Sequence, residues 1–206
     1  MEIQDNLYGL VVCGGQSTRM GFDKGFLIYH RKPQCYHLAD LLLQDPNPLC
    51  FKAFISCNDK QTALISKDYN VLPDHPAYQN SGPIASVLTA FATHPNASFL
   101  VVGCDYPFIE KNDLMVFLES IQEDSLAAAF YNDDNKFEPL LAWYSRNAGL
   151  SLQTFYENGG KSLQHFLHVN SAEKYRPDNQ NIMTSIDTPE AFASAKVTLA
   201  NQRTTR

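Results

Sequence analysis

The sequence lacks any apolar stretch near the roughly 20 residues that a membrane-spanning helix needs. Its start, MEIQDNLYGLVV, has neither a basic leader nor a small-residue cleavage site, which argues against a secretory signal peptide. It also shows no internal repeat, low-complexity tract or linker-like segment. We therefore expect a cytoplasmic protein without a membrane partner, whose 206 residues form a single domain, 1–206.

Basic residues are also too few for a broad nucleic-acid surface. The chain holds 16 Lys and Arg against 22 Asp and Glu, which gives a formal net charge of −6. Because nucleic-acid surfaces normally carry an excess of basic charge, we expect no nucleic-acid partner. A small anionic ligand stays compatible with this balance, provided that the cations that meet it are gathered in one place.

Cysteine pairs with metal-binding or redox spacing are absent as well. No C-x-x-C pair occurs, and the number of cysteines is odd, with thiols at positions 13, 35, 50, 57 and 104. Neither a zinc site nor a disulfide framework is indicated, so we expect reduced and mostly buried thiols. If the strands that end beside Cys13 and Cys104 are neighbours in the sheet, these two thiols lie side by side, and we predict that both are reduced.

The sequence does contain strand-like segments that alternate with helix-like ones. Apolar runs typical of strands lie at 7–12, 51–57, 71–72, 98–103, 126–131 and 139–144. Segments with helical spacing lie at 34–43, 59–67 (with Asp59 as N-cap), 82–93, 111–120, 148–157, 162–167 and 190–199. This alternation indicates βαβ units. We therefore predict an α/β fold, a three-layer αβα, Rossmann-like domain with a mainly parallel sheet.

A glycine-rich segment follows the first predicted strand. In VVCGGQSTRMGFDKG, residues 11–25, exposed backbone N–H groups can converge on a phosphate. The segment fits neither the P-loop nor the G-x-G-x-x-G fingerprint, because Gly14 and Gly15 are adjacent and no Gly-Lys-Ser/Thr follows at the required spacing. Arg19 and Lys24 in the same segment favour a cradle for a triphosphate over an incidental surface loop.

Two aspartates follow predicted strands, at the edge where open α/β sheets bind ligands. Asp105 comes directly after the apolar strand in VVGCDYPF. Its carboxylate is placed to hold Mg²⁺, and a turn or helix cap is the alternative role. Asp74 follows the short strand that Pro73 ends, and it is either a ligand contact or a turn residue.

The glycine-rich segment resembles the signature of a known family. VVCGGQSTRMGFDKGFL is similar to the L-x-G-G-x-S-x-R-M-G-x-D-K pattern of the MobA-like nucleotidyltransferases, with matches at positions 14, 15, 17, 19, 20, 21, 23 and 24. LPDHPAYQNSGPIASVLTAF, VVGCDYPFI and IDTPEAF resemble later motifs of the same family, so the resemblance covers most of the chain. The branch with the most similar motifs transfers a guanylyl group, and the resemblance implies a fold of the nucleotide-diphospho-sugar transferase type.

The resemblance implies a reaction and a set of residues. A terminal phosphate of molybdopterin or molybdenum-molybdopterin would attack the α-phosphorus of GTP with Mg²⁺ as cofactor, and pathway proteins would be partners. The catalytic residues would be Arg19 at the leaving pyrophosphate, Lys24 at the reacting phosphorus, and Asp105. The nucleotide-binding residues would be Val12, Cys13, Gly14, Gly15, Lys24, Ser56, Asp74, Gly82 and Asp105. The metal would lie on Asp105 and Asp187, although Asp187 could instead cap the last helix in place of Thr188.

Four positions depart from the family pattern. Arg31 and Ser86 replace glycines, Ser56 replaces an asparagine, and Glu138 stands where histidine or glutamine is usual. These positions bear on the base and the acceptor, so two alternatives stay open. One is a related transferase of the same fold that uses CTP or acts on another small-molecule phosphate, such as a sugar or alcohol phosphate, and the other is a catalytically silent nucleotide-binding protein. The adjacent glycines of the loop favour GTP over CTP.

Overall fold

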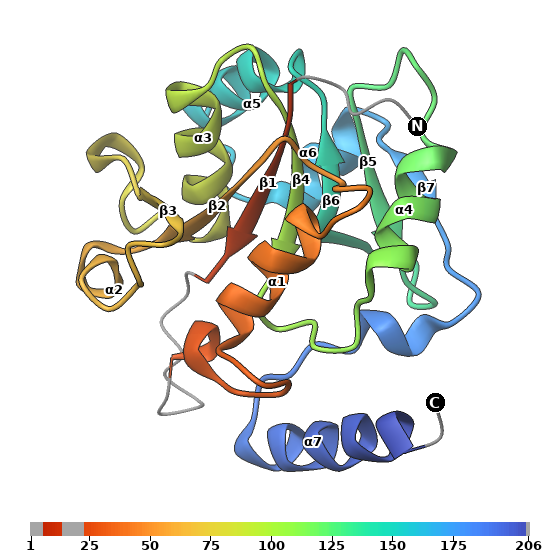
Figure 1. The fold of residues 1–206 in the computed structure, drawn as a ribbon. Coiled ribbons are helices and arrows are strands. Elements are labelled where there is room, and N and C mark those ends of the chain that lie inside the picture. The colour runs from red at the N-terminus through yellow and green to blue at the C-terminus, as the bar shows by residue number, and fades with distance from the viewer. Residues whose placement is uncertain (1–5, 14–22, 205–206) are drawn as a thin grey trace.

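The computed structural model describes residues 6–13 and 23–204 (Figure 1). The strands are β1 (Leu7–Val12), β2 (Lys52–Cys57), β3 (Asn70–Pro73), β4 (Ser98–Gly103), β5 (Ala127–Tyr131), β6 (Phe137–Tyr144) and β7 (Glu173–Tyr175). The α-helices are α1 (Gln34–Leu43), α2 (Asp59–Thr62), α3 (Pro83–Thr93), α4 (Lys111–Ser120), α5 (Ala148–Glu157), α6 (Leu163–Val169) and α7 (Pro189–Thr204). Short 3₁₀ helices are η1 (Lys24–Phe26), η2 (Pro76–Tyr78) and η3 (Gln180–Met183).

The strands form one seven-stranded sheet in the order β3-β2-β1-β4-β6-β5-β7. β1 pairs in parallel with β2 and β4, and only β6 runs antiparallel to its neighbours β4 and β5. The predicted mainly parallel sheet is therefore confirmed. Val12 lies opposite Ser56 on one side and Gly103 on the other, so three strands end at one edge.

Helices cover both faces of the sheet, which confirms the three-layer prediction. Successive residues of a strand point to opposite faces, so Val11 joins the core under α1 and α4, and Leu10 joins the core under α3, α5 and α6. The two central strands β1 and β4 are apolar along nearly their whole length because both of their faces are buried.

The start of α2 differs from the sequence prediction. The N-cap is Asn58 and not Asp59, because the Asn58 side chain accepts hydrogen bonds from the backbone N–H groups of Lys60 and Gln61. The Gln61 side chain accepts a bond from the Asn58 N–H in return, which completes a capping box. The helix ends at Thr62, well short of the predicted residue 67.

The last helix, α7, lies beyond the carboxyl ends of the parallel strands, away from the two helical layers (Figure 1). It packs through Phe192 and Leu199 against Tyr29 and Ile186 in a small core of its own. The Ala191 N–H donates to the Thr188 hydroxyl at 3.2 Å, so Thr188 caps this helix as predicted. The alternative in which Asp187 replaces Thr188 as the cap is therefore wrong.

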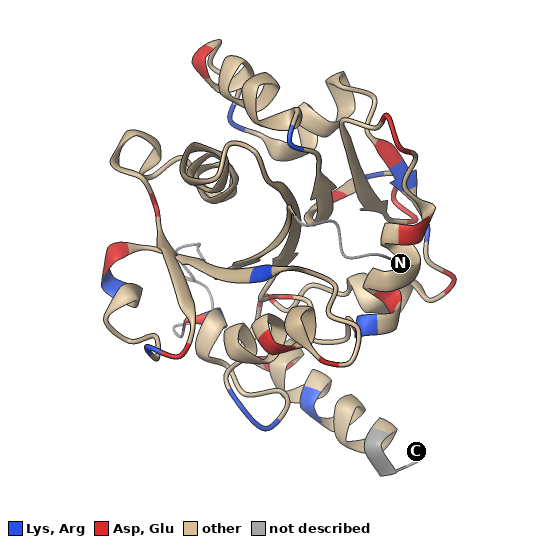
Figure 2. Cartoon of the chain, turned by 45° about the horizontal axis from the view of Figure 1, so that its top comes forward, with Lys and Arg blue, Asp and Glu red and all other residues tan. Residues whose placement is uncertain are grey.

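Charged groups are spread over the outside of the described structure. Figure 2 shows Lys and Arg scattered among Asp and Glu on the outer loops and helices. Within the described residues, no helix combines the length and the apolar character required to cross a membrane.

Candidate functional site

The carboxyl ends of β1, β2 and β4 bring predicted site residues together. The Cys13 N–H donates to the Ser56 carbonyl at 3.1 Å, and the Cys104 N–H donates to the Val12 carbonyl at 3.0 Å. These backbone bonds continue the sheet one residue past the strands, so the side chains that follow leave from the same edge. The predicted loop residues Gly14, Gly15 and Arg19 lie outside the described residues.

Asp105 is held at this edge by the segment before α7. Its Oδ2 accepts a hydrogen bond from the Ser185 hydroxyl at 2.9 Å, and its backbone carbonyl accepts one from the Ile186 N–H at 2.9 Å. A side chain at Gly103 would place its Cβ 2.5 Å from Asp105 Oδ1. Glycine at 103 therefore gives the carboxylate room to turn back over the strand end.

A lysine and a second carboxylate lie beside Asp105. Lys24 of η1 forms an ion pair with Asp187 from the segment before α7. Burial raises the pKa of Asp105, whereas the Ser185 hydrogen bond and the charge of Lys24 lower it. The charge of Asp187 raises the same pKa. The structure thus brings the predicted residues Lys24, Asp105 and Asp187 into one electrostatic group.

This group suits magnesium in the number and kind of its ligands. Mg²⁺ takes carboxylate oxygens and usually binds to one or two of them, with water and substrate phosphates completing the shell. Asp105 and Asp187 would supply two carboxylates. Within residues 6–13 and 23–204, no three His, Cys, Asp or Glu side chains gather into a metal-binding group. The described residues therefore do not form a site in which protein ligands alone surround the metal.

A second part of the site lies at the ends of β2 and β3. The Asp74 N–H donates to the Cys57 carbonyl at 3.1 Å, which holds Asp74 at the sheet edge. Burial raises the pKa of the Asp74 carboxyl, and a hydrogen bond with Ser86 opposes this shift. In the described structure, Asp74 Oδ1 and the Ser56 hydroxyl are buried without a hydrogen-bond partner. Buried polar groups are normally paired, so these two atoms mark a place for a polar ligand.

Helix α3 begins next to this second part. Gly82, its N-cap, has φ of 74°, a conformation that side-chain-bearing residues rarely adopt. A Cβ at this glycine would meet nothing within 4 Å, so the backbone conformation, not space, requires glycine here. Ser86, which departs from the family's glycine, is buried and supports Asp74 from the same helix.

Glu138 and Tyr106 form a polar network next to Asp105. The Tyr106 hydroxyl donates to Glu138 Oε2 at 2.8 Å, and the Asn132 amide donates to Glu138 Oε1 at 2.7 Å. Glu138 therefore holds the residue that follows the metal-binding candidate. The sequence indicates Glu138 only as a departure from the family pattern, because its partner Tyr106 lies on a different strand end.

The predicted contact between Cys13 and Cys104 is confirmed. Their Sγ atoms lie 3.0 Å apart, and both are free thiols. Their mutual hydrogen bond and burial raise the pKa of Cys13, and burial raises that of Cys104. Their redox state in solution stays a prediction.

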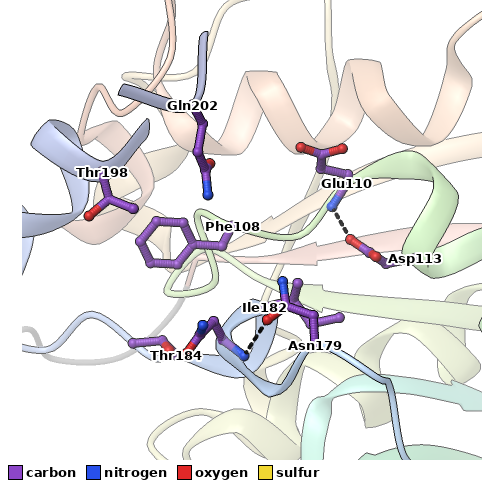
Figure 3. Close-up of a pocket in the computed structure, with 9 residues that line it drawn as sticks. Phe108, Glu110, Asp113, Asn179, Ile182, Thr184, Thr198 and Gln202 are labelled. Atoms are coloured by element: carbon purple, nitrogen blue, oxygen red, sulfur yellow. Dashed lines mark hydrogen bonds between the residues drawn. The ribbon is translucent and has the colours of Figure 1, made fainter. Parts of the chain in front are cut away.

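A cavity of about 470 Å³ lies between α7 and the segment after Asp105 (Figure 3). The Phe108 ring lines it between Thr198 and Gln202 of α7 on one side and Ile182 and Thr184 on the other. The cavity is also lined by two carboxylate residues, Glu110 and Asp113. Their negative charge makes the cavity unfavourable for a triphosphate.

The sheet with helices on both faces is a three-layer α/β fold. Residues 9–174 match the family model described as the MobA-like NTP transferase domain, and since they cover most of the chain, the chain belongs to this family and is a nucleotidyltransferase. The predicted family and enzyme class are confirmed. Ser185, Asp187 and α7 lie beyond the matched range.

Named relatives and a solved structure are similar to this chain. A molybdenum cofactor biosynthesis bifunctional protein from Synechocystis sp. is 28% identical over 92% of this chain and 53% of its own length, so the chain spans about half of that relative. A molybdenum cofactor guanylyltransferase from Shewanella sediminis is 24% identical over 88% of this chain and 91% of its own length. The crystal structure of molybdopterin-guanine dinucleotide biosynthesis protein A from Archaeoglobus fulgidus has a TM-score of 0.75 at 22% identity, covering 94% of this chain and 99% of that one, and so shares the fold.

Proposed function

We propose that the protein transfers a guanylyl group from GTP to molybdopterin or molybdenum-molybdopterin and releases pyrophosphate. The observation that carries this proposal is the grouping of Lys24, Asp105 and Asp187 at the strand edge, directly after the glycine-rich loop. The names of the relatives support the choice of substrates. Proteins that supply molybdopterin or receive the product would be partners.

The phosphates would meet the glycine-rich loop and Lys24. Phosphoryl-type chemistry needs mainly positioning and neutralisation of charge, and an ionised phosphate oxygen of the acceptor needs no side-chain base. Lys24 would leave Asp187 to neutralise charge at the α-phosphorus, and Arg19 would neutralise the leaving pyrophosphate. When bound to Asp105 and Asp187, Mg²⁺ supplies further positive charge to the phosphate oxygens.

The base would lie at the ends of β2 and β3. An ionised carboxylate only accepts hydrogen bonds, so Asp74 suits the adjacent N1–H and N2–H₂ donors of guanine. Cytosine presents one amino donor beside an acceptor nitrogen, and that acceptor would face a negative oxygen. The buried and unpartnered Asp74 Oδ1 and Ser56 hydroxyl support this placement.

The experiment that tests the proposal is a pyrophosphate-release assay with Mg²⁺, a molybdopterin source and either GTP or CTP. We expect turnover with GTP and none without metal or acceptor. Turnover with CTP alone would overturn the guanylyl assignment. Tight GTP binding without turnover would instead identify a catalytically silent nucleotide-binding protein.

A further inference from the structure

We infer that Gln61 is a positioning residue for the transfer reaction: it fixes Asp23, and Asp23 fixes the turn that carries Lys24. The inference rests on the proposed function, because Gln61 and Asp23 would affect the reaction only through the position of Lys24. It also assigns Asp23 a role within the protein and not on the metal or nucleotide.

The contacts of Asp23 occupy both oxygens of its carboxylate. Oδ1 accepts a hydrogen bond from the Gly25 N–H at 3.0 Å, so Asp23 caps η1. Oδ2 accepts a hydrogen bond from Gln61 Nε2 on α2. One bond is local and the other reaches an element 38 residues away in sequence, so Asp23 joins its own turn to helix α2.

Both polar atoms of the Gln61 side-chain amide form hydrogen bonds in this link. Its side chain is buried, its Oε1 accepts from the Asn58 N–H at 2.9 Å, and its Nε2 donates to Asp23. The position needs one acceptor and one donor on the same side chain, which only an amide offers at this length. Because Asn58 directly follows β2, the link ties Asp23 to the sheet.

The turn after Asp23 is held by weak backbone bonds. The Phe26 N–H donates to the Asp23 carbonyl at 3.1 Å, and the Leu27 N–H donates to the Lys24 carbonyl at 3.3 Å. Such a single 3₁₀ turn has poor hydrogen-bond geometry and is held weakly on its own. Lys24 reaches its partner through a flexible four-carbon chain, so the position of its backbone decides where its ammonium can act.

Exchanging the two side chains tests this inference. In the double variant Asp23→Asn/Gln61→Glu, the new amide at position 23 can accept from the Gly25 N–H through its oxygen and donate through its nitrogen. The new carboxylate at position 61 can accept that bond and the one from the Asn58 N–H. All the bonds are kept and the net charge is unchanged. Each single variant breaks the link, because Gln61→Glu sets two carboxylates against each other and Asp23→Asn sets two amide donors against each other.

We expect each single variant to lower kcat about tenfold or more while KM for GTP changes less, and we expect the double variant to return to within about threefold of the wild type. Lys60→Ala, on the exposed neighbour of Gln61, is the control and should leave both constants unchanged. If the single variants do not fold, Gln61→Met, which keeps the length without the bonds, replaces them in the comparison.

A second readout does not depend on turnover. The rate at which Lys24 is modified by an amine reagent, followed by mass spectrometry, should rise in the single variants and fall back in the double variant. An inactive wild type that shows this pattern would contradict the proposed function and keep the inference. A double variant that stays as impaired as Asp23→Asn would overturn it, since the carboxylate at position 23 would then be needed at the ligand. Gln61 variants with wild-type kcat and Lys24 reactivity would overturn it as well.

Discussion

Lys24 and Asp187 form an ion pair across 163 residues of sequence, between the end of the glycine-rich loop and the start of the last helix. The ammonium therefore lies beside the two carboxylates that we assign to magnesium. In the proposed reaction, Asp105 and Asp187 would hold the metal, whose positive charge would offset theirs, and Lys24 would then be free to contact the phosphates.

Asp187→Asn tests the second metal ligand. We expect the Mg²⁺ concentration for half-maximal rate to rise on the order of tenfold, because the metal loses a charged ligand. The measurement is the rate of pyrophosphate release as a function of Mg²⁺ concentration, with Asp124→Asn on the exposed surface as the control. An unchanged Mg²⁺ dependence, with or without a lower kcat, would restrict Asp187 to its role as the partner of Lys24.

Ser185→Ala should shift the pH dependence of the reaction. Asp105 must be ionised to hold metal, and burial already raises its pKa. The Ser185 hydrogen bond favours the ionised form, so its loss raises the pKa further and moves the acid limb of kcat/KM to higher pH. A pH profile of kcat/KM, compared with that of Ser194→Ala on the exposed side of α7, shows the shift. An acid limb that stays in place would mean that Asp105 does not govern it.

Asp74→Asn should weaken recognition of guanine. Hydrogen bonds to charged groups contribute about 1.5–3 kcal/mol, so kcat/KM for GTP should fall by about 10- to 150-fold. The wild type should also prefer GTP over ITP, which lacks the N2 amino group, and the variant should lose that preference. Equal preference in both proteins would place Asp74 away from the base.

The same variant has a predictable effect on stability. Because the pKa of Asp74 is raised on folding, its contribution to stability is fully present below the unfolded pKa and is lost as the pH rises through the folded pKa. Asp74→Asn should therefore melt at a higher temperature than the wild type in neutral buffer, with a smaller difference in acid. A lower melting temperature at neutral pH would show that Ser86 and its surroundings more than compensate for burial.

Cys13 and Cys104 should be reduced and slow to react. Both thiols are buried and their raised pKa values keep them protonated, so a thiol reagent should modify them in the folded protein far more slowly than after denaturation. Mass spectrometry after a timed reaction measures this directly. A Cys13–Cys104 disulfide in protein prepared without reductant would contradict the prediction.

Much of the framework could be predicted from local patterns. β1 and β4 are continuous apolar runs because both faces of a central parallel strand are buried, and their ends locate Cys13 and Asp105. β7 was not predicted, since its three residues Glu173–Tyr175 are too few and too polar for a strand pattern. The boundaries of α2 were wrong because two adjacent cap-forming residues, Asn58 and Asp59, compete for one position.

The contacts within the site could be predicted less well than its members. The sequence indicated Lys24, Asp105 and Asp187 separately, but a pair such as Lys24 and Asp187 leaves no local signal. The bond between Gln61 and Asp23 is of the same kind, because the two residues lie 38 positions apart in the sequence. Ser86 stands where the family has glycine, and its role beside Asp74 could be seen only once the structure had placed α3 against that residue.

The position of Ser185 and Asp187 in the chain separates the site from the sheet. The seven strands lie within residues 7–175, whereas Ser185 and Asp187 follow the last strand. The hydrogen bond to the Asp105 carboxylate and the ion pair with Lys24 therefore come from a segment that contributes no strand. Substitutions in this segment can alter the site while the pairing of the strands is left intact.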